Sequence, residues 1–201
     1  YLLAYLLYND GIQTVIAVAA IFGAEELGIP VGKLALIILM IQFTAFLGAY
    51  VFSYLAGVLG TRNAIILSLI IWSGAVIYAF FGMRNTAILP ALGIPQAEFE
   101  FWLLGFTIAL VLGGSQALSR SLFSQMIPED QEAEFFSFYE VSERGTSWMG
   151  TFIFGVVNQT FGSLRLGVLS VIFFFLAGLV LLLFVNTDTA VKQAELVSAG
   201  D

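Results

Sequence analysis

Six long apolar runs follow one another along this chain, and they constrain its fold more than any other feature. The runs cover residues 1–23, 34–59, 64–82, 101–118, 137–161 and 166–186. A helix needs roughly 20 apolar residues to cross the hydrocarbon core of a membrane. Because lipid offers the backbone no water to bond with, such a run crosses as a helix. The sequence therefore predicts an all-α membrane protein with six transmembrane helices over residues 1–186 and a polar C-terminal tail over residues 187–201.

The composition agrees with lipid as the surrounding solvent. Sixty per cent of the 201 residues are apolar and 10 per cent are charged, and the mean hydropathy is +0.98, values rarely found in water-soluble domains. The chain has no cysteine and no histidine, which excludes a disulfide framework and removes the commonest metal ligand. Its net charge of −7 argues against nucleic acid as a partner. We expect a multi-pass protein of the bacterial inner membrane that contacts lipid and uses no cofactor or metal.

The six runs differ in character, and the differences repeat after three runs. The first and fourth carry polar clusters, the second and fifth carry small residues at four-residue spacing, and the third and sixth are almost purely apolar. The small residues, which let another helix approach closely, are Ala45, Ala49, Ser53, Gly57, Ser147, Thr151 and Gly155. A polar, packing and lipid-facing order that occurs twice is typical of a three-plus-three inverted repeat.

Asp10 is the sharpest candidate for a functional residue. It stands in the middle of the first apolar run, where a carboxylate costs about 2.5 to 3.5 kcal/mol unless it faces a cavity or a partner. Asn9, Gln13 and Thr14 are close in sequence and could hydrate or orient it. Two interpretations stay open. Asp10, with Asn9 and Gln13, lines a path for substrate or protons, or its carboxylate caps or bonds a neighbouring helix.

A second group of charged residues stands near the start of the fifth run. Glu140 and Arg144 are spaced i, i+4 with the acid first, the favourable order for an ion pair along one helix. In the alternative interpretation, Glu140, Glu143 or Arg144 belongs to a proton relay or to a gate between conformations. Gln116 in the fourth run is a weaker candidate for the same path. Arg120 is expected to bond helix-terminal carbonyls or lipid headgroups.

The common catalytic constellations are absent from the sequence. There is no histidine to act as a base, no cysteine nucleophile and no phosphate loop of the Walker pattern. The adjacent Gly113 and Gly114 lie inside an apolar run, where they permit close helix packing. The sequence predicts that this protein is not an enzyme.

Three motifs resemble those of a known family. They are YNDGIQTV at residues 8–15, GGSQALSRSLF at residues 113–123 and EFFSFY at residues 134–139. In this order and spacing they resemble the unknown-major-facilitator family, a branch of the major facilitator superfamily that includes vacuolar amino-acid effluxers. The resemblance implies a twelve-helix fold in which this chain is the C-terminal six-helix half. Residue 1 already lies inside an apolar run, so we expect a missing N-terminal six-helix half as a partner.

The resemblance also implies a function. The expected activity is secondary active transport of a small solute, with amino acids as candidate solutes, by alternating access between two halves. Asp10 or Glu143 is then a candidate for coupling to protons. Two competing classes are a membrane receptor or assembly subunit that moves no solute, and a lipid-handling protein of the same fold.

Overall fold

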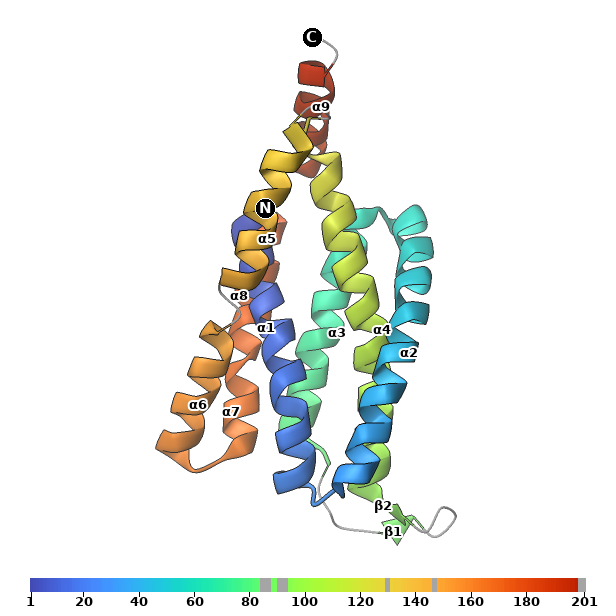
Figure 1. The fold of residues 1–201 in the computed structure, drawn as a ribbon, viewed down its shortest axis with the longest axis vertical. Coiled ribbons are helices and arrows are strands. Elements are labelled where there is room, and N and C mark those ends of the chain that lie inside the picture. Colours follow the sequence, from blue (N-terminus) through green and yellow to red (C-terminus); the bar gives the residue numbers. More distant parts are fainter. Residues whose placement is uncertain (84–87, 90–93, 129–130, 146–147, 199–201) are drawn as a thin grey trace.

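Helices that run side by side make up most of the molecule (Figure 1). The computed structural model describes residues 1–83, 88–89, 94–128, 131–145 and 148–198. Within these residues, five segments are long and apolar enough to cross a membrane: Leu2–Glu26, Val31–Leu59, Thr61–Phe81, Gln96–Gln125 and Leu164–Phe184. The prediction of a helical, multi-pass membrane protein is therefore confirmed.

The candidate spans correspond to seven helical elements. They are α1 (Leu2–Ile21) with the π-helical turn η1 (Phe22–Glu26), α2 (Val31–Leu59), α3 (Thr61–Phe81), α4 (Gln96–Gln125), and α7 (Leu164–Ser170) with α8 (Ile172–Phe184). The other described elements are α5 (Glu132–Gly145), α6 (Met149–Phe161), α9 (Thr187–Ser198) and the strands β1 (Ile88–Leu89) and β2 (Ile94–Pro95). The two strands pair antiparallel and add a small hairpin to a chain whose sequence predicted helices alone.

The apolar run at residues 137–161 is divided between two helices. It contains the second half of α5 and all of α6, and residues 146–147 between them lie outside the described part of the chain. At 1.5 Å per residue, the 13 residues of α6 extend about 20 Å, which is shorter than the hydrocarbon core of a bilayer. The start of α6 therefore falls within the depth of the bundle (Figure 1).

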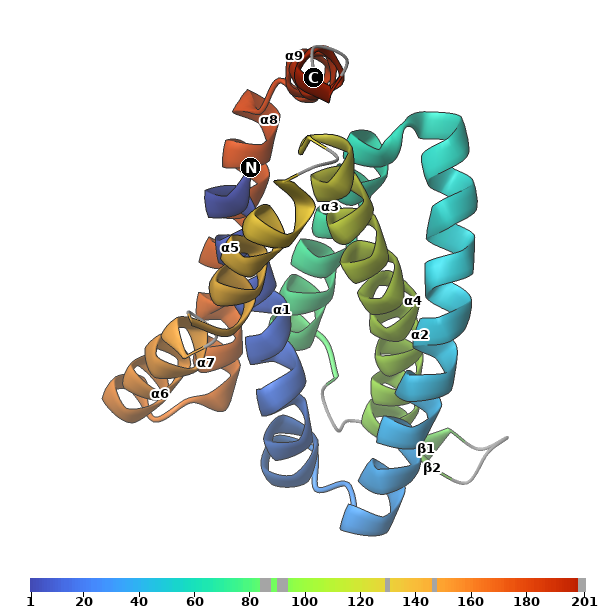
Figure 2. The same ribbon diagram turned by 45° about the horizontal axis from the view of Figure 1, so that its top comes forward.

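The helices pack in two groups joined by α3. In one group α2 lies along α4, and in the other α1 contacts α8, α5 and α6 (Figure 2). Helix α3 contacts α4 on one side and α7 and α8 on the other. Trp72 of α3 is buried and stacks on Phe175 of α8, with ring centroids 5.5 Å apart. Aromatic packing of this kind holds the two groups together through α3.

Two arginines connect α3 with the last span at its two ends. Arg62, at the start of α3, donates from Nη2 to the carbonyl oxygen of Leu183 at 2.7 Å, near the end of α8. Arg165, at the start of α7, donates from Nη1 to the carbonyl oxygen of Gly82 at 2.7 Å, just after α3. The last carbonyls of a helix have no partner within it, and cations there are favourable. Helix α3 thus supplies the cation at the end of α8, and α7 supplies the cation at the end of α3.

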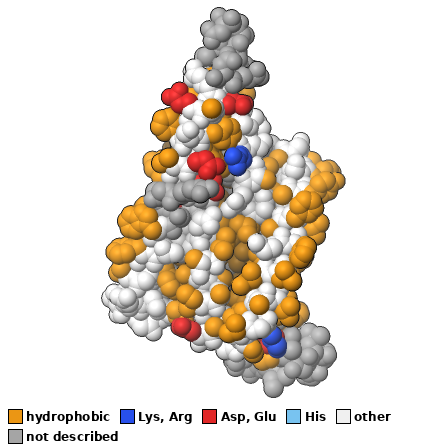
Figure 3. Space-filling model, viewed as in Figure 1, with side chains coloured by type: hydrophobic (Ala, Val, Ile, Leu, Met, Phe, Trp, Pro, Cys, Tyr) orange, Lys and Arg blue, Asp and Glu red, His pale blue; other side chains and the backbone are white. Residues whose placement is uncertain are grey.

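The outer surface of the bundle is largely apolar. Figure 3 shows hydrophobic side chains spread over the whole face in view, with the few charged side chains in its upper half and near its lower edge. Helix α2 contributes Phe43, Phe46, Tyr50 and Tyr54, each more than 70 % exposed. A surface of this kind suits lipid or the face of another membrane domain.

Candidate functional site

Asp10 lies in the interior of the bundle and binds a neighbouring helix. The residue is only 1 % exposed. Oδ2 accepts a hydrogen bond of 2.6 Å from the backbone N–H of Gly150, the second residue of α6. The other oxygen, Oδ1, is buried and has no hydrogen-bond partner among the described residues. Asp10 therefore caps the start of α6 from another helix, with one carboxylate oxygen left over.

The close approach of α1 and α6 depends on Gly150 having no side chain. A Cβ atom at this position would overlap Oγ1 of Thr14 and lie 3.1 Å from Oδ2 of Asp10. The Thr14 hydroxyl donates to the carbonyl oxygen of Asp10 at 2.7 Å, the bond that Ser and Thr commonly make to the preceding helical turn. We define the Asp10 cap as Asp10, Thr14 and Gly150. Sequence analysis identified Asp10 but missed Gly150, whose only local signal is its place after a polar stretch.

A second polar site lies between α1, α4 and α5. It is an open pocket of about 230 Å³ whose lining residues are Tyr5, Gln116, Ala117, Arg120, Tyr139 and Glu143. The rings of Tyr5 and Tyr139 stack with centroids 4.3 Å apart. We call the space lined by these six residues the charged pocket, because the guanidinium of Arg120 and the carboxylate of Glu143 both line it.

The guanidinium of Arg120 has two neighbours in α5. Its Nη2 lies 3.7 Å from Oε1 of Glu140, and its Cζ lies 5.4 Å from the ring centroid of Phe136. Both partners of the ion pair are well exposed, with side chains 60 % and 42 % accessible, so this pair contributes little to stability. A guanidinium carries five N–H donors, more than this one ion pair uses among the described residues.

Tyrosine and serine hydroxyls connect α1 with α4 beside this pocket. The hydroxyls of Tyr8 and Ser119 lie 2.6 Å apart, and Tyr1 donates to the carbonyl oxygen of Ser119 at 2.7 Å. Ser119 in turn donates to the carbonyl oxygen of Ser115 at 2.6 Å. These bonds hold the two polar helices in a fixed relation at one end of the bundle.

Ion pairs join helices at the opposite end. Lys33 of α2 lies 2.7 and 2.8 Å from the two carboxylate oxygens of Glu98 in α4. Arg165 donates from Nε to Oε1 of Glu26 at 2.6 Å, and its Cζ lies 5.7 Å from the ring centroid of Phe22. Sequence analysis did not predict these pairs, since their members are 65 and 139 residues apart.

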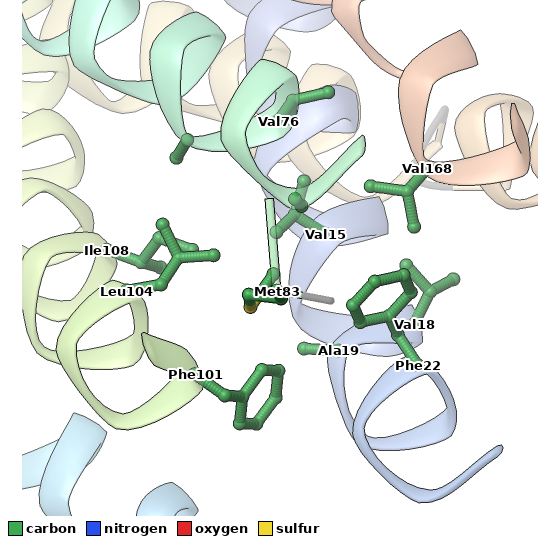
Figure 4. A pocket seen from close by; sticks show the side chains of 12 residues that line it. Val15, Val18, Ala19, Phe22, Val76, Met83, Phe101, Leu104, Ile108 and Val168 are labelled. Atoms are coloured by element: carbon green, nitrogen blue, oxygen red, sulfur yellow. The ribbon is translucent and has the colours of Figure 1, made fainter. Parts of the chain in front are cut away.

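Two further cavities are almost entirely apolar. A cavity of about 40 Å³ lies between α1, α3, α4 and α7, with Phe22, Met83 and Phe101 among its lining residues (Figure 4). A larger groove of about 220 Å³ lies between α1, α2 and α4, and Gln42 is its polar lining residue. Neither offers charged groups to a solute.

The structure divides the predicted path residues into two sets. Asn9 is buried in α1 next to Asp10, and Gln13 is half-buried. Gln116 and Glu143 line the charged pocket. Glu140 pairs with Arg120. The side chain of Arg144 lies outside the described part of the chain, so the i, i+4 ion pair stays a prediction.

The small residues of the predicted packing faces differ in burial. Ala45 and Ala49 are half-buried, whereas Ser53 and Gly57 are exposed. Thr151 and Gly155 are half-buried, and Ser147 lies outside the described residues. The glycine that α4 contacts most closely on α2 is Gly48, which sequence analysis had not singled out.

Comparison with known proteins identifies the relatives of this chain. It is 32 % identical over 97 % of its length to an uncharacterized MFS-type transporter, YxiO, of Bacillus subtilis. It is 29 % identical over 99 % of its length to autophagy-related protein 22-1 of Penicillium rubens, and 30 % identical over 97 % to autophagy-related protein 22 of Coccidioides immitis. The chain covers 42 %, 34 % and 33 % of the lengths of these three proteins. No solved structure matches.

A family model gives the assignment. The model described as vacuole effluxer Atg22 like matches residues 1–195, which is nearly the whole chain. This family consists of transporters and not of enzymes, in agreement with the prediction from sequence. The chain belongs to the Atg22-like vacuole effluxer family.

Proposed function

We propose that this chain is one six-helix half of a twelve-helix secondary active transporter that moves a small solute, with amino acids as the candidate class, by alternating access. The charged pocket is the observation that carries the proposal. It places a guanidinium, a carboxylate and two stacked tyrosines around an open space of about 230 Å³ between three helices. That volume is below the range typical of drug-sized ligands, which fits a small solute.

The pocket chemistry favours a zwitterionic solute. A guanidinium matches a carboxylate in geometry and charge and can bind it with two parallel hydrogen bonds. Arg120 would take the carboxylate of the solute, and Glu143 would take its ammonium group. Gln116 supplies both a donor and an acceptor to the same space.

Two features support a three-plus-three inverted repeat within the proposed half. Arg62 at the start of α3 and Arg165 at the start of α7 each donate to carbonyls at the end of the other span. A two-fold relation between the third and sixth spans would produce this mutual capping. Gly60 and Gly162, which precede these helices, both have positive φ values of 86° and 62°, a conformation that glycine adopts without strain.

The proposal also includes an N-terminal six-helix half in the full-length protein and a location in a bacterial membrane. The chain covers 42 % of the Bacillus relative that is named an MFS-type transporter, which leaves room for a second half in that protein. The exposed aromatic face of α2 would contact that half or lipid. Because this relative is a bacterial protein, the proposed location is the cell membrane of a bacterium, which is the inner membrane in bacteria with two membranes.

The test is solute flux into proteoliposomes that hold the full-length protein. We expect uptake of L-leucine by the wild type, but little uptake of L-leucinamide, which lacks the carboxylate, or of N-acetyl-L-leucine, which lacks the ammonium group. Arg120→Gln should abolish leucine uptake. Lys192→Gln, which changes an exposed cation on α9, should leave it unchanged. Absence of flux for every small zwitterion tested would favour a receptor or assembly subunit.

Lipid handling is the second candidate function, and the apolar groove between α1, α2 and α4 favours it. The groove measures about 220 Å³ and is lined by Ile37, Ile41 and Leu112, among other apolar residues. The same proteoliposomes can contain a fluorescent phosphatidylcholine. Protein-dependent movement of this lipid between leaflets, without uptake of leucine, would replace the transporter proposal.

A further inference from the structure

We propose that Asp10 is the proton-binding group of this transporter and that its negative charge holds α6 against α1 as a removable cap. The inference rests on the proposed function and adds a coupling ion and a moving part to it. In this mechanism, Oδ1 takes up the proton, Oδ2 becomes a neutral carbonyl oxygen, and the attraction between Asp10 and the start of α6 weakens.

The start of α6 is a place where a helix end needs a partner. The first N–H groups of any helix have no acceptor within that helix, and the peptide dipoles give this end a partial positive charge. The N–H of Gly150 finds its acceptor in Oδ2 of Asp10, 140 residues away in sequence. A hydrogen bond to an ionised carboxylate is roughly twice as strong as one between neutral groups. The charge of Asp10 therefore sets the strength of the contact between α1 and α6.

The unused oxygen of Asp10 is the observation that fits a proton as the ligand. Oδ1 is buried without a hydrogen-bond partner among the described residues, and an unsatisfied charged oxygen in a membrane interior is costly. A proton needs only this one oxygen. A metal cation takes several oxygen ligands, and a Na⁺ gradient is therefore the alternative driving force that the experiment below tests.

The positive group that faces the Asp10 carboxylate is the start of α6, with its partial positive charge. Helices α6 and α8, which pack against α1, contain no titratable side chain. Helix α5 carries Tyr139 and Glu143 in the charged pocket, Glu140 in its pair with Arg120 of α4, and Glu132 and Glu134 in its first turn. Arg144 also belongs to the sequence of α5, and its side chain lies outside the described part of the chain. The turn η1 carries Glu25 and Glu26. In the described part of the chain, no basic side chain forms an ion pair with Asp10.

The contact with Asp10 lies at one end of α6. Helix α5 ends at Gly145, α6 begins at Met149, and the hydrogen bond from Asp10 reaches the second residue of α6. When Asp10 is ionised, α6 is held at its first turn. When Asp10 is protonated, α6 can separate from α1 without breaking a charged hydrogen bond. Proton binding and a change in helix packing are thereby linked.

The experiment compares driven transport with exchange in the full-length protein. Asp10→Asn keeps a side-chain oxygen that can accept the hydrogen bond from the N–H of Gly150. Unlike a carboxylate, the amide does not take up a proton when the pH falls. In proteoliposomes, we expect this variant to retain exchange of leucine across the membrane and to lose accumulation driven by a pH gradient. Glu132→Gln, a matched change of an exposed carboxylate on α5, should retain both activities.

Infrared difference spectroscopy provides a readout that does not depend on flux. Because every carboxylate that takes up a proton adds a carbonyl band as pH falls, the readout is the difference between two proteins. The wild type and Glu132→Gln should show a band of a protonated carboxylic acid that is missing from the spectrum of Asp10→Asn. Gradient-driven accumulation by Asp10→Asn, or accumulation that follows a Na⁺ gradient at constant pH, would overturn the inference. If the wild type transports no solute, the proposed function fails. The infrared band then decides alone whether Asp10 binds a proton.

Discussion

Among the helix contacts that depend on glycine, two differ in the kind of atom that the glycine meets. Between α2 and α4, a Cβ atom on Gly48 would overlap the backbone of Leu110, and a Cβ atom on Gly113 would overlap the carbonyl oxygen of Ala45. Between α1 and α6, a Cβ atom on Gly150 would meet side-chain atoms of the Asp10 cap. The first contact joins two backbones, and the second joins a backbone to side chains.

The difference shows which part of the bundle can change its packing. The backbones of α2 and α4 cannot yield locally, so these helices of 29 and 30 residues stay together or separate as units. At the contact between α1 and α6, Gly150 meets the hydroxyl of Thr14 and the carboxylate of Asp10. A rotation of either side chain would change this contact without moving a whole helix. We expect the pair α2 and α4 to act as a rigid frame and the pair α1 and α6 as an adjustable contact.

The largest effect is expected from breaking the frame. Gly113→Ala would place a methyl group on the backbone of α2, and overpacking of this kind typically costs about 3 kcal/mol when the neighbour cannot move. Thermal unfolding of the full-length protein in detergent should show a lower midpoint. Ala45→Gly should fail to rescue the variant, because the obstructing atom is a carbonyl oxygen. Recovery by this second change would show that the contact is not a backbone contact.

A smaller effect is expected from the matched change in the adjustable contact. Gly150→Ala should cost about 1 to 2 kcal/mol, because side chains yield more easily than backbone. Here a second change should help: Thr14→Ala removes the hydroxyl that the new methyl group would overlap. In a double-mutant cycle of unfolding midpoints, we expect strong non-additivity between the two positions. Additive effects would contradict the described contact.

A local effect is expected from removing the cap alone. Loss of a helix cap costs about 1 kcal/mol, so Asp10→Ala should make the first turn of α6 open more often. Hydrogen–deuterium exchange of a peptide that covers residues 149–153 should become faster, while peptides from α2 and α4 should keep their protection. Equal acceleration in both regions would show that Asp10 stabilises the whole bundle and not one contact.

The smallest effect is expected at a glycine where an added methyl group would contact no other atom. Gly74 in α3 is exposed, and a Cβ atom there would have no neighbour within 4 Å. Since glycine in a helix interior is less favourable than alanine by about 0.5 to 1 kcal/mol, Gly74→Ala should raise the unfolding midpoint slightly. A lower midpoint would mean that another part of the full-length protein packs on this side of α3.

The sequence by itself determined that the chain crosses a membrane and that Asp10 is unusual. Both conclusions depend on local composition, because an apolar run of sufficient length must form a helix in lipid and a carboxylate within it needs a partner. Five of the predicted spans correspond to described helical segments long enough to cross a membrane. The three motifs also led to the family that the comparisons confirm.

Only the tertiary structure decided which residues meet. It paired Asp10 with Gly150 and Arg120 with Glu140, gathered the charged pocket from three helices, and divided the fifth segment into α5 and α6. Local patterns could not supply these contacts, since a hydrogen bond between residues 140 positions apart depends on how whole helices pack. Apolar periodicity records how much of a helix faces lipid or protein. It does not indicate which polar atom of a neighbouring helix a given side chain contacts.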